Sequence, residues 1–387
     1  MTKPTTFLRN LAAPSAETLY ERAMQDQKTY NELPDGTKLV PIFNPEFTRF
    51  DQHNDVQLLS NKDGEAYASK RRYSIETSFG IDYTAVLYQP TDDPRHNFYI
   101  DIDTAVCTGV NGLNDEVAAR LVEEIGVPVI LKGPEFSGES GAGLGRLASV
   151  ALAATNISQS FSAETSMAIS AEIVDFENLP RRTVVYGKSR GAMVGGKKYP
   201  YAHDREIDVI HYRLIDPCVG RRALEGPADV LRYGIWPASD LMQSLPSFAK
   251  FALEGKLKAR ARTIETSPSY LTGMLLGAVP SLLSGETTGD CIPLHKGVSL
   301  VHMANNPIAD TADYLQQFSH HPNFDHHEVS DTHMGGIVLP RNIRRTVRHL
   351  KDFGSAFDQA GGDEAQIDWT SVHNNPQKAS ITRIHAA

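Results

Sequence analysis

The segment from Arg182 to Gly195 constrains the fold of this chain more than any other stretch. It opens with the run Thr-Val-Val-Tyr at residues 183–186, which predicts a buried strand. The pentapeptide Gly-Lys-Ser-Arg-Gly follows at residues 187–191, and small residues that can begin a helix come next. The two glycines leave room for a strained turn that holds the hydroxyl of Ser189 clear of the sheet. The segment therefore predicts a strand, a serine-bearing turn and a helix in direct succession.

The size and charge of the chain limit its class. Its 387 residues suffice for one large α/β domain with insertions or for two ordinary domains. Hydrophobic residues make up 41% and charged residues 22%, which is typical of a soluble globular protein. The net charge of −9 argues against a general phosphate-binding surface, and the basic stretches at 256–262 and 341–345 are interpreted as solvated helix faces. We therefore expect no nucleic-acid partner.

Targeting signals are missing from the sequence. The first ten residues lack the apolar region of a secretory signal, and no apolar run approaches the roughly 18 residues that a membrane span needs. Cys107, Cys218 and Cys291 are odd in number and widely spaced, so they indicate neither a disulfide framework nor a CxxC metal site. A cytoplasmic location is the expectation.

Strand and helix patterns alternate along the central part of the chain. Residues 73–79 and 83–88 alternate like a hairpin at a sheet edge. Further strands are expected at 97–102, 127–131, 183–186, 209–215, 298–303 and 327–330, with helices at 114–126, from 147 to about 178, and at 341–353. This alternation predicts an α/β fold with a mostly parallel central sheet and helices on both faces.

The same pattern divides the chain into regions. Residues 1–71 are polar and irregular and are interpreted as an N-terminal arm or cover. The α/β core is expected to comprise residues 72–219 and 294–360, followed by a polar C-terminal tail at 361–387. Residues 220–293 are helical and apolar in patches, with Pro and Gly breaks, which is typical of an inserted helical cap.

With the Gly187–Gly191 turn on its central strand, this order of elements resembles the α/β-hydrolase superfamily. The likeness covers residues 72–353 and puts 220–293 where that family places its lid. It implies a serine hydrolase that cleaves a carboxylic ester or related acyl substrate through a covalent acyl-enzyme on Ser189. It also implies that an acid and then a histidine follow the serine along the chain, and that no metal or organic cofactor is required.

His333 is the candidate base. It follows the last expected strand and precedes two glycines and the terminal helix. A neutral imidazole can take the serine proton and return it to the leaving group. Nearby histidines lie before that position and lack the H-E-x-x-H spacing of a zinc site, so a chance surface cluster is the better interpretation of His320, His321, His326 and His327.

Two aspartates compete for the role of the acid. The family usually carries this aspartate in a turn after the strand that corresponds to residues 298–303, but here Asn306 stands at that position. Asp310, four residues further on, is the first candidate, and Asp216, directly after the preceding strand, is the alternative. The remaining possibilities are Asp313, Asp331 or no acid at all.

The resemblance also implies an oxyanion hole made of backbone N–H groups. One donor is Arg190, and the other comes from the loop after the strand at 97–102, where Thr104 or Ala105 should donate. Large apolar residues of the expected cap should line the acyl pocket, namely Trp236, Phe248, Phe251, Tyr270 and Met274. The expected partner is therefore a small acyl compound with a hydrophobic acyl group.

Competing interpretations use some of the same residues. Ser140 is a second candidate nucleophile, although its glycine-rich loop is too long for a strained turn. A phosphate-binding loop that ends at Lys188 would need glycine at position 182, which is arginine. The alternative function is a hydrolase fold without catalysis, acting as a binding or structural component, and Asn306 keeps that alternative open.

Overall fold

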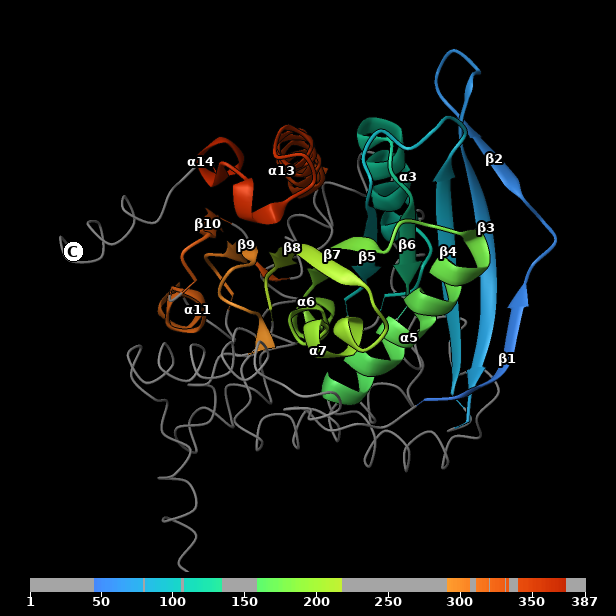
Figure 1. The fold of residues 1–387 in the computed structure, drawn as a ribbon, viewed down its shortest axis with the longest axis horizontal. Coiled ribbons are helices and arrows are strands. Elements are labelled where there is room, and N and C mark those ends of the chain that lie inside the picture. Colours follow the sequence, from blue (N-terminus) through green and yellow to red (C-terminus); the bar gives the residue numbers. More distant parts are fainter. Residues whose placement is uncertain are drawn as a thin grey trace, which may run out of the picture.

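A ten-stranded mixed sheet runs through the centre of the molecule (Figure 1). The computed structural model describes residues 45–78, 81–105, 108–133, 159–217, 291–306, 311–319, 321–330, 332–333 and 340–373. The strands are β1 (Phe47–Gln52), β2 (Gln57–Ser60), β3 (Ala66–Thr77), β4 (Asp82–Pro90), β5 (Tyr99–Asp103), β6 (Val129–Lys132), β7 (Arg182–Lys188), β8 (Asp208–Ile215), β9 (Gly297–Met303) and β10 (Phe324–Val329). Their order is β1-β3-β4-β6-β5-β7-β8-β9-β10, and β2 pairs with β3 beside this path.

The sheet has an antiparallel part and a parallel part. β1, β2, β3 and β4 pair antiparallel, and β4 joins β6 antiparallel. From β6 to β10 every neighbouring pair is parallel. All residues of β5, β6 and β9 are buried, because helices cover both faces of the parallel part. The expected hairpin and the mostly parallel sheet are confirmed.

Helices cover both faces of the sheet, as Figure 1 shows. One face carries α3 (Leu113–Ile125), α13 (Pro340–Gln359) and α14 (Trp369–Val372), whose apolar residues join one core cluster with the sheet. The other face carries α5 (Gln159–Glu177), α6 (Arg190–Gly196), α7 (Tyr199–His203) and α11 (Thr311–Phe318), which join a second cluster. None of the described helices combines the length and apolar character that a membrane crossing requires.

Both ends of the described chain hold more structure than the sequence suggested. Residues 47–71, which we expected in a polar arm, form β1, β2 and the start of β3. β1 and β2 lie at the sheet edge with mostly exposed side chains, so their sequence shows little apolar alternation. Past residue 361, a 3₁₀ turn (Glu364–Gln366) and α14 follow, and the ring of Trp369 lies against Gly297. The part of the expected cap at 220–290 lies outside the described residues.

Candidate active site

The turn between β7 and α6 has the strained backbone expected for a serine held clear of the sheet. Ser189 has φ 54° and ψ −122°, a conformation that costs an L-residue on the order of 1–3 kcal/mol. Its N–H donates to the carbonyl of Ile215 at 2.8 Å, which ties the turn to the end of β8. The surrounding packing therefore maintains the conformation despite its cost.

The two glycines of the pentapeptide are required by close backbone approaches. A Cβ atom on Gly187 would lie 2.3 Å from the carbonyl oxygen of Gly191. A Cβ atom on Gly191 would lie 2.2 Å from the carbonyl oxygen of Asp103, at the end of β5. Both contacts are far inside van der Waals distance, so any larger residue would push the turn away from α6 or from β5.

His333 lies next to the serine hydroxyl. Its Nε2 is 2.9 Å from Ser189 Oγ, and both residues are about 1% exposed. Its Nδ1 is 2.5 Å from Asp216 Oδ2. Because an ionised carboxylate only accepts hydrogen bonds, Nδ1 carries the proton and the lone pair of Nε2 faces the serine. That tautomer is the one a general base at Ser189 needs.

Asp216 is fully buried and reached by three donors. Oδ2 accepts from His333, while Oδ1 accepts from the N–H of Met303 at 3.1 Å and from the hydroxyl of Tyr314 at 2.9 Å. These donors stabilise the charged form of a carboxylate that is itself inaccessible to solvent. Asp216 has φ 49°, so it shares with Ser189 a backbone conformation that non-glycine residues rarely adopt.

The structure brings together Ser189, His333 and the alternative acid Asp216. The first candidate acid, Asp310, lies outside the described residues, as do Asp331 and Ser140 and the side chain of Asp313. The carboxylate at His333 Nδ1 comes from the loop after β8, whereas we expected it after β9. Asn306, which follows β9, instead donates its Nδ2 to the hydroxyl of Tyr314 at 3.1 Å and so supports Asp216 indirectly.

The loop after β5 lies against the start of α6. The N–H of Thr104 donates to the carbonyl of Lys132 at 3.3 Å, so it continues the pairing with β6. The carbonyl of Ala105 accepts from both the N–H and the hydroxyl of Thr108, which ties the loop back on itself. Because the N–H of Thr104 already has an acceptor, Ala105 remains the better of the two expected donors from this loop.

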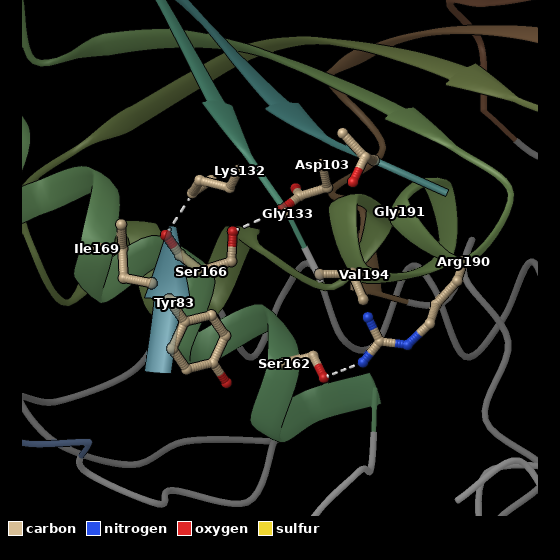
Figure 2. A pocket seen from close by; sticks show the side chains of 11 residues that line it. Tyr83, Asp103, Lys132, Gly133, Ser162, Ser166, Ile169, Arg190, Gly191 and Val194 are labelled. Atoms are coloured by element: carbon tan, nitrogen blue, oxygen red, sulfur yellow. Dashed lines mark hydrogen bonds between the residues drawn. The ribbon is translucent and has the colours of Figure 1, made fainter. Parts of the chain in front are cut away.

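A hollow lies beside this loop, and Figure 2 shows its lining. The side chain of Arg190 reaches across its mouth and donates from Nη2 to Ser162 Oγ at 2.5 Å. Most other lining residues are polar, and they come from β4, β5, β6 and α5: Tyr83, Asp103, Thr104, Lys132 and Ser166. The expected apolar wall, Trp236, Phe248, Phe251, Tyr270 and Met274, lies outside the described residues. The described wall of the hollow thus combines polar side chains with the apolar residues Ile169 and Val194.

The candidate site contains side-chain groups for proton transfer, and no described group of three or more His, Cys, Asp or Glu residues could hold a metal ion. His326 and His327, which we interpreted as part of a chance surface cluster, lie within β10 and are half-buried. The imidazole of His326 contacts His302 at 2.5 Å, and burial lowers its pKa to about 3. The ring of His326 is therefore neutral near pH 7, and it stacks on the ring of His302.

Similarity to solved structures agrees with this fold. No protein-family model and no curated protein matches the sequence. The peroxisomal α/β-hydrolase Lpx1 of Saccharomyces cerevisiae aligns over 88% of this chain and 97% of its own, at a TM-score of 0.51 and 13% identity. An α/β-hydrolase fold protein of Chitinophaga pinensis aligns over 72% of this chain and 96% of its own, at a TM-score of 0.47 and 15% identity. The acetyl xylan esterase 1 of a Thermoanaerobacterium species aligns over 91% of this chain and 98% of its own, at a TM-score of 0.46 and 11% identity.

At sequence identities this low, the similarity to solved structures is evidence about the fold and not about the function. Together with the strand order, the chain has the α/β-hydrolase fold, as its sequence predicted. Its candidate site lies at the carboxyl ends of β5, β7, β8 and β10, the edge where an α/β sheet usually binds its ligands.

Proposed function

We propose that this chain is a serine hydrolase that cleaves a carboxylic ester or a related acyl compound. The observation that carries the proposal is the hydrogen-bonded series from Ser189 Oγ through His333 to Asp216. The three groups follow one another along the chain in the order serine, acid, histidine, which is the order of the α/β-hydrolase triad. A binding protein would have no need of a strained serine with an oriented base beside it.

In the first half of the reaction, Ser189 Oγ attacks the carbonyl carbon while His333 Nε2 takes the hydroxyl proton. The carbonyl oxygen becomes an oxyanion, and in this proposal the backbone N–H groups of Arg190 and Ala105 bind it. The tetrahedral intermediate collapses when His333 returns the proton to the leaving alcohol. An acyl-enzyme on Ser189 remains.

In the second half, a water molecule replaces the alcohol. His333 takes a proton from this water, whose oxygen attacks the acyl carbon, and the second tetrahedral intermediate releases the acid and restores the Ser189 hydroxyl. Asp216 stays ionised throughout, since its role is to orient the imidazole and to stabilise its positive form. No metal or organic cofactor enters these steps.

The acid in this proposal is Asp216 and not Asp310. His333 has two ring nitrogens, and each already has its place: Nε2 faces Ser189 and Nδ1 donates to Asp216. A second carboxylate would have to displace Asp216, which Tyr314 and Met303 also hold. The substrate is proposed to be a small acyl compound, with the hydrophobic acyl group expected from the cap residues.

Hydrolysis of a p-nitrophenyl ester series tests this proposal. Ser189→Ala should abolish turnover, and Asp216→Asn should lower kcat by about 10⁴-fold, because the imidazole loses its orienting carboxylate. Asp310→Asn serves as the matched control and should retain wild-type kcat. If the Asp310→Asn variant lost activity and the Asp216→Asn variant kept it, Asp310 would be the triad acid.

Covalent labelling separates an enzyme from a binding component. A fluorophosphonate should label Ser189 in the folded protein at neutral pH and leave the Ser189→Ala variant unlabelled, because only an activated serine displaces fluoride. A folded wild-type protein that is neither labelled nor active on any ester would favour the alternative, a hydrolase fold that acts as a binding or structural component.

A further inference from the structure

A buried charge cluster, Asp101, Asp103, Lys132 and Lys198, lies directly beneath the candidate site. Their side chains come from three parts of the chain: β5, the end of β6, and the segment between α6 and α7. Asp101 and Lys198 are 0% exposed, Lys132 is 3% and Asp103 is 7%. Four charged groups this deep in a protein are costly unless they neutralise one another. The two carboxylates and two ammonium groups have opposite and equal charge.

The contacts within the cluster are dense. Lys198 Nζ lies 2.6 Å from Asp101 Oδ2 and also contacts Asp103 Oδ2. Lys132 Nζ lies 2.5 Å from Asp101 Oδ1 and donates to the carbonyl of Ser166 at 2.9 Å. Two hydroxyls of α5 complete the network, since Ser166 Oγ donates to Asp103 Oδ1 at 2.7 Å and Ser170 Oγ donates to Asp101 Oδ1 at 3.0 Å.

Opposite charges keep the cluster ionised. Burial would raise the pKa of Asp101, but the ammonium groups of Lys132 and Lys198 outweigh it and lower that pKa. Burial would lower the pKa of Lys198, but the carboxylates of Asp101 and Asp103 outweigh it and raise that pKa. For Lys132 burial prevails and lowers the pKa to about 8. Near neutral pH Asp101 and Lys198 are therefore both charged, and Lys198 also contacts Asp103 to form the central link of the cluster.

This link joins the two backbone segments that the proposed oxyanion hole requires. Asp103 ends β5 and directly precedes Thr104 and Ala105. Lys198 follows α6, whose first residue, Arg190, offers the other N–H. The carbonyl of Asp103 also lies against Gly191, so side chain and backbone hold the same two segments together.

Stability alone is a poor reason for such a cluster, because well-packed apolar residues of similar size often stabilise a core as well or better. A stronger reason for the cluster is that it can fix the positions of the backbone donors of the oxyanion hole. Donors of an oxyanion hole act only when they are held within about 0.5 Å of the position that the negative oxygen will occupy. Charged hydrogen bonds of fixed direction hold two segments more strictly than interchangeable apolar contacts do.

We propose that the buried charge cluster, and above all the Asp103–Lys198 pair, is the positioning device of the oxyanion hole. It sets the loop after β5 against the start of α6, so that the N–H groups of Ala105 and Arg190 converge on one point. The inference rests on the proposed hydrolase function, because it concerns a group that forms only during acyl transfer. Asp103 and Lys198 are positioning residues, because they act through the two backbone segments and not on the reacting atoms.

The test compares Asp103→Asn with the wild type in ester hydrolysis and in binding of an aryl trifluoromethyl ketone. Such a ketone adds to the serine, and its negative oxygen occupies the oxyanion hole. The substitution should lower kcat and weaken ketone binding, each by about 10²-fold, with KM changed less than about threefold, because only the transition state uses the hole. A general loss of structure would instead change KM and the unfolding temperature together.

Lys296→Met is the matched control. Lys296 is 2% exposed and pairs with two carboxylates, those of Asp208 and Glu364, but it lies at the amino end of β9, opposite the candidate site. This variant should keep wild-type kcat and ketone affinity whatever it loses in stability. An equal loss of kcat in both variants would overturn the inference.

Ser166→Ala is a second, milder variant for the case that Asp103→Asn does not fold. It removes one hydrogen bond to Asp103 Oδ1 and should lower kcat and ketone affinity by about fivefold to tenfold. Wild-type kcat in the folded Asp103→Asn variant, or in the Ser166→Ala variant if the former does not fold, would overturn the inference and leave the hydrolase function standing. A wild-type protein without activity or labelling at Ser189 would overturn both.

Discussion

At the scale of single residues, the acid site depends on Tyr314. The Tyr314 hydroxyl lies 2.9 Å from Asp216 Oδ1 and 2.8 Å from the carbonyl of Pro217, and it accepts from Asn306 Nδ2 at 3.1 Å. Its single proton serves the carboxylate and the carbonyl. Asn306 stands after β9, where the resemblance led us to expect the aspartate. Through Tyr314 it helps to hold Asp216, which follows β8.

Tyr314→Phe tests this support. The change leaves the N–H of Met303 as a donor to Asp216 Oδ1 and removes a hydrogen bond to a buried charge, worth about 1.5–3 kcal/mol. We expect kcat to fall about tenfold or more with little change in KM, measured with the p-nitrophenyl ester that the wild type prefers. Ser319→Ala, just beyond the end of α11, is a control that should behave like the wild type. Unchanged kcat after Tyr314→Phe would mean that Asp216 needs no such donor.

The competition between Asp216 and Asp310 also shows where sequence reasoning stops at this scale. Both aspartates follow an expected strand of the parallel sheet, so both were compatible with the triad order. Spacing along the chain says which strand a residue follows, but it does not say which loop turns toward the imidazole. The contacts of Tyr314 and Met303 with Asp216 join residues that are far apart in the sequence, so no local sequence pattern predicts them.

At the scale of elements, the serine turn depends on how closely α6 approaches β5. Gly191 lies where a side chain would meet the backbone of Asp103, whereas a side chain on Gly195, one turn later, would meet a methyl group of Val185 at 2.8 Å. The atoms that a side chain on Gly191 would meet belong to the backbone and cannot easily move, whereas the atom that a side chain on Gly195 would meet is the end of the Val185 side chain. Gly191 and Gly195, which lie in the same short helix, therefore make a matched pair for mutation.

Gly191→Ala should separate α6 from β5, displace the N–H of Arg190, and lower kcat by about 10²-fold or more. Gly195→Ala should cost stability, about 1–3 kcal/mol from overpacking, but leave kcat within about threefold of the wild type. Activity and urea unfolding of both variants would be measured side by side. Equal kcat in the two variants would contradict a special role for the α6–β5 contact.

At the scale of the whole molecule, the closing elements pack on β8 through neutral histidines. His211 Nε2 lies 2.8 Å from His349 Nε2, and the rings of His349 and His373 stack. Burial lowers the pKa of His211 and His349 well below the usual value, and nearby imidazoles and Arg213 lower it further. Burial and then Arg213 lower the pKa of His373 to about 4.

This arrangement predicts acid sensitivity. The unfolded chain binds protons at its histidines as the pH falls through about 6.5, whereas the folded chain keeps His373 neutral until about pH 4. The free energy of unfolding should therefore fall progressively between pH 6.5 and pH 4, by about 3 kcal/mol from His373 alone. The fall would be measured as urea unfolding midpoints at pH 7, 6, 5 and 4.

His373→Phe keeps a stacking ring but removes the proton site, so it should flatten part of this pH dependence. His53→Gln, at an exposed position next to β1, is the control and should leave the dependence unchanged. A His373→Phe protein whose stability falls with pH as steeply as the wild type would show that His373 does not contribute.

The sequence by itself determined the α/β class, the parallel strands and the serine turn, and these predictions of fold are confirmed. Strands β5, β7, β8 and β9 each carry apolar or β-branched residues that are buried in the sheet, and the Gly187–Gly191 pattern lies within five adjacent residues, so both can be seen locally. The pairing of Ser189 with His333 was reached by order along the chain, and it remains a proposal for catalysis.

Only the tertiary structure decided which residues meet. It placed Asp216 at His333, joined Asp103 to Lys198 across 95 positions of the chain, and added β1, β2 and α14 to a core expected to begin and end elsewhere. The physical reason is common to all three. A buried charge or an edge strand is stable only with its partner in place, and that partner comes from a distant part of the chain that no local pattern identifies.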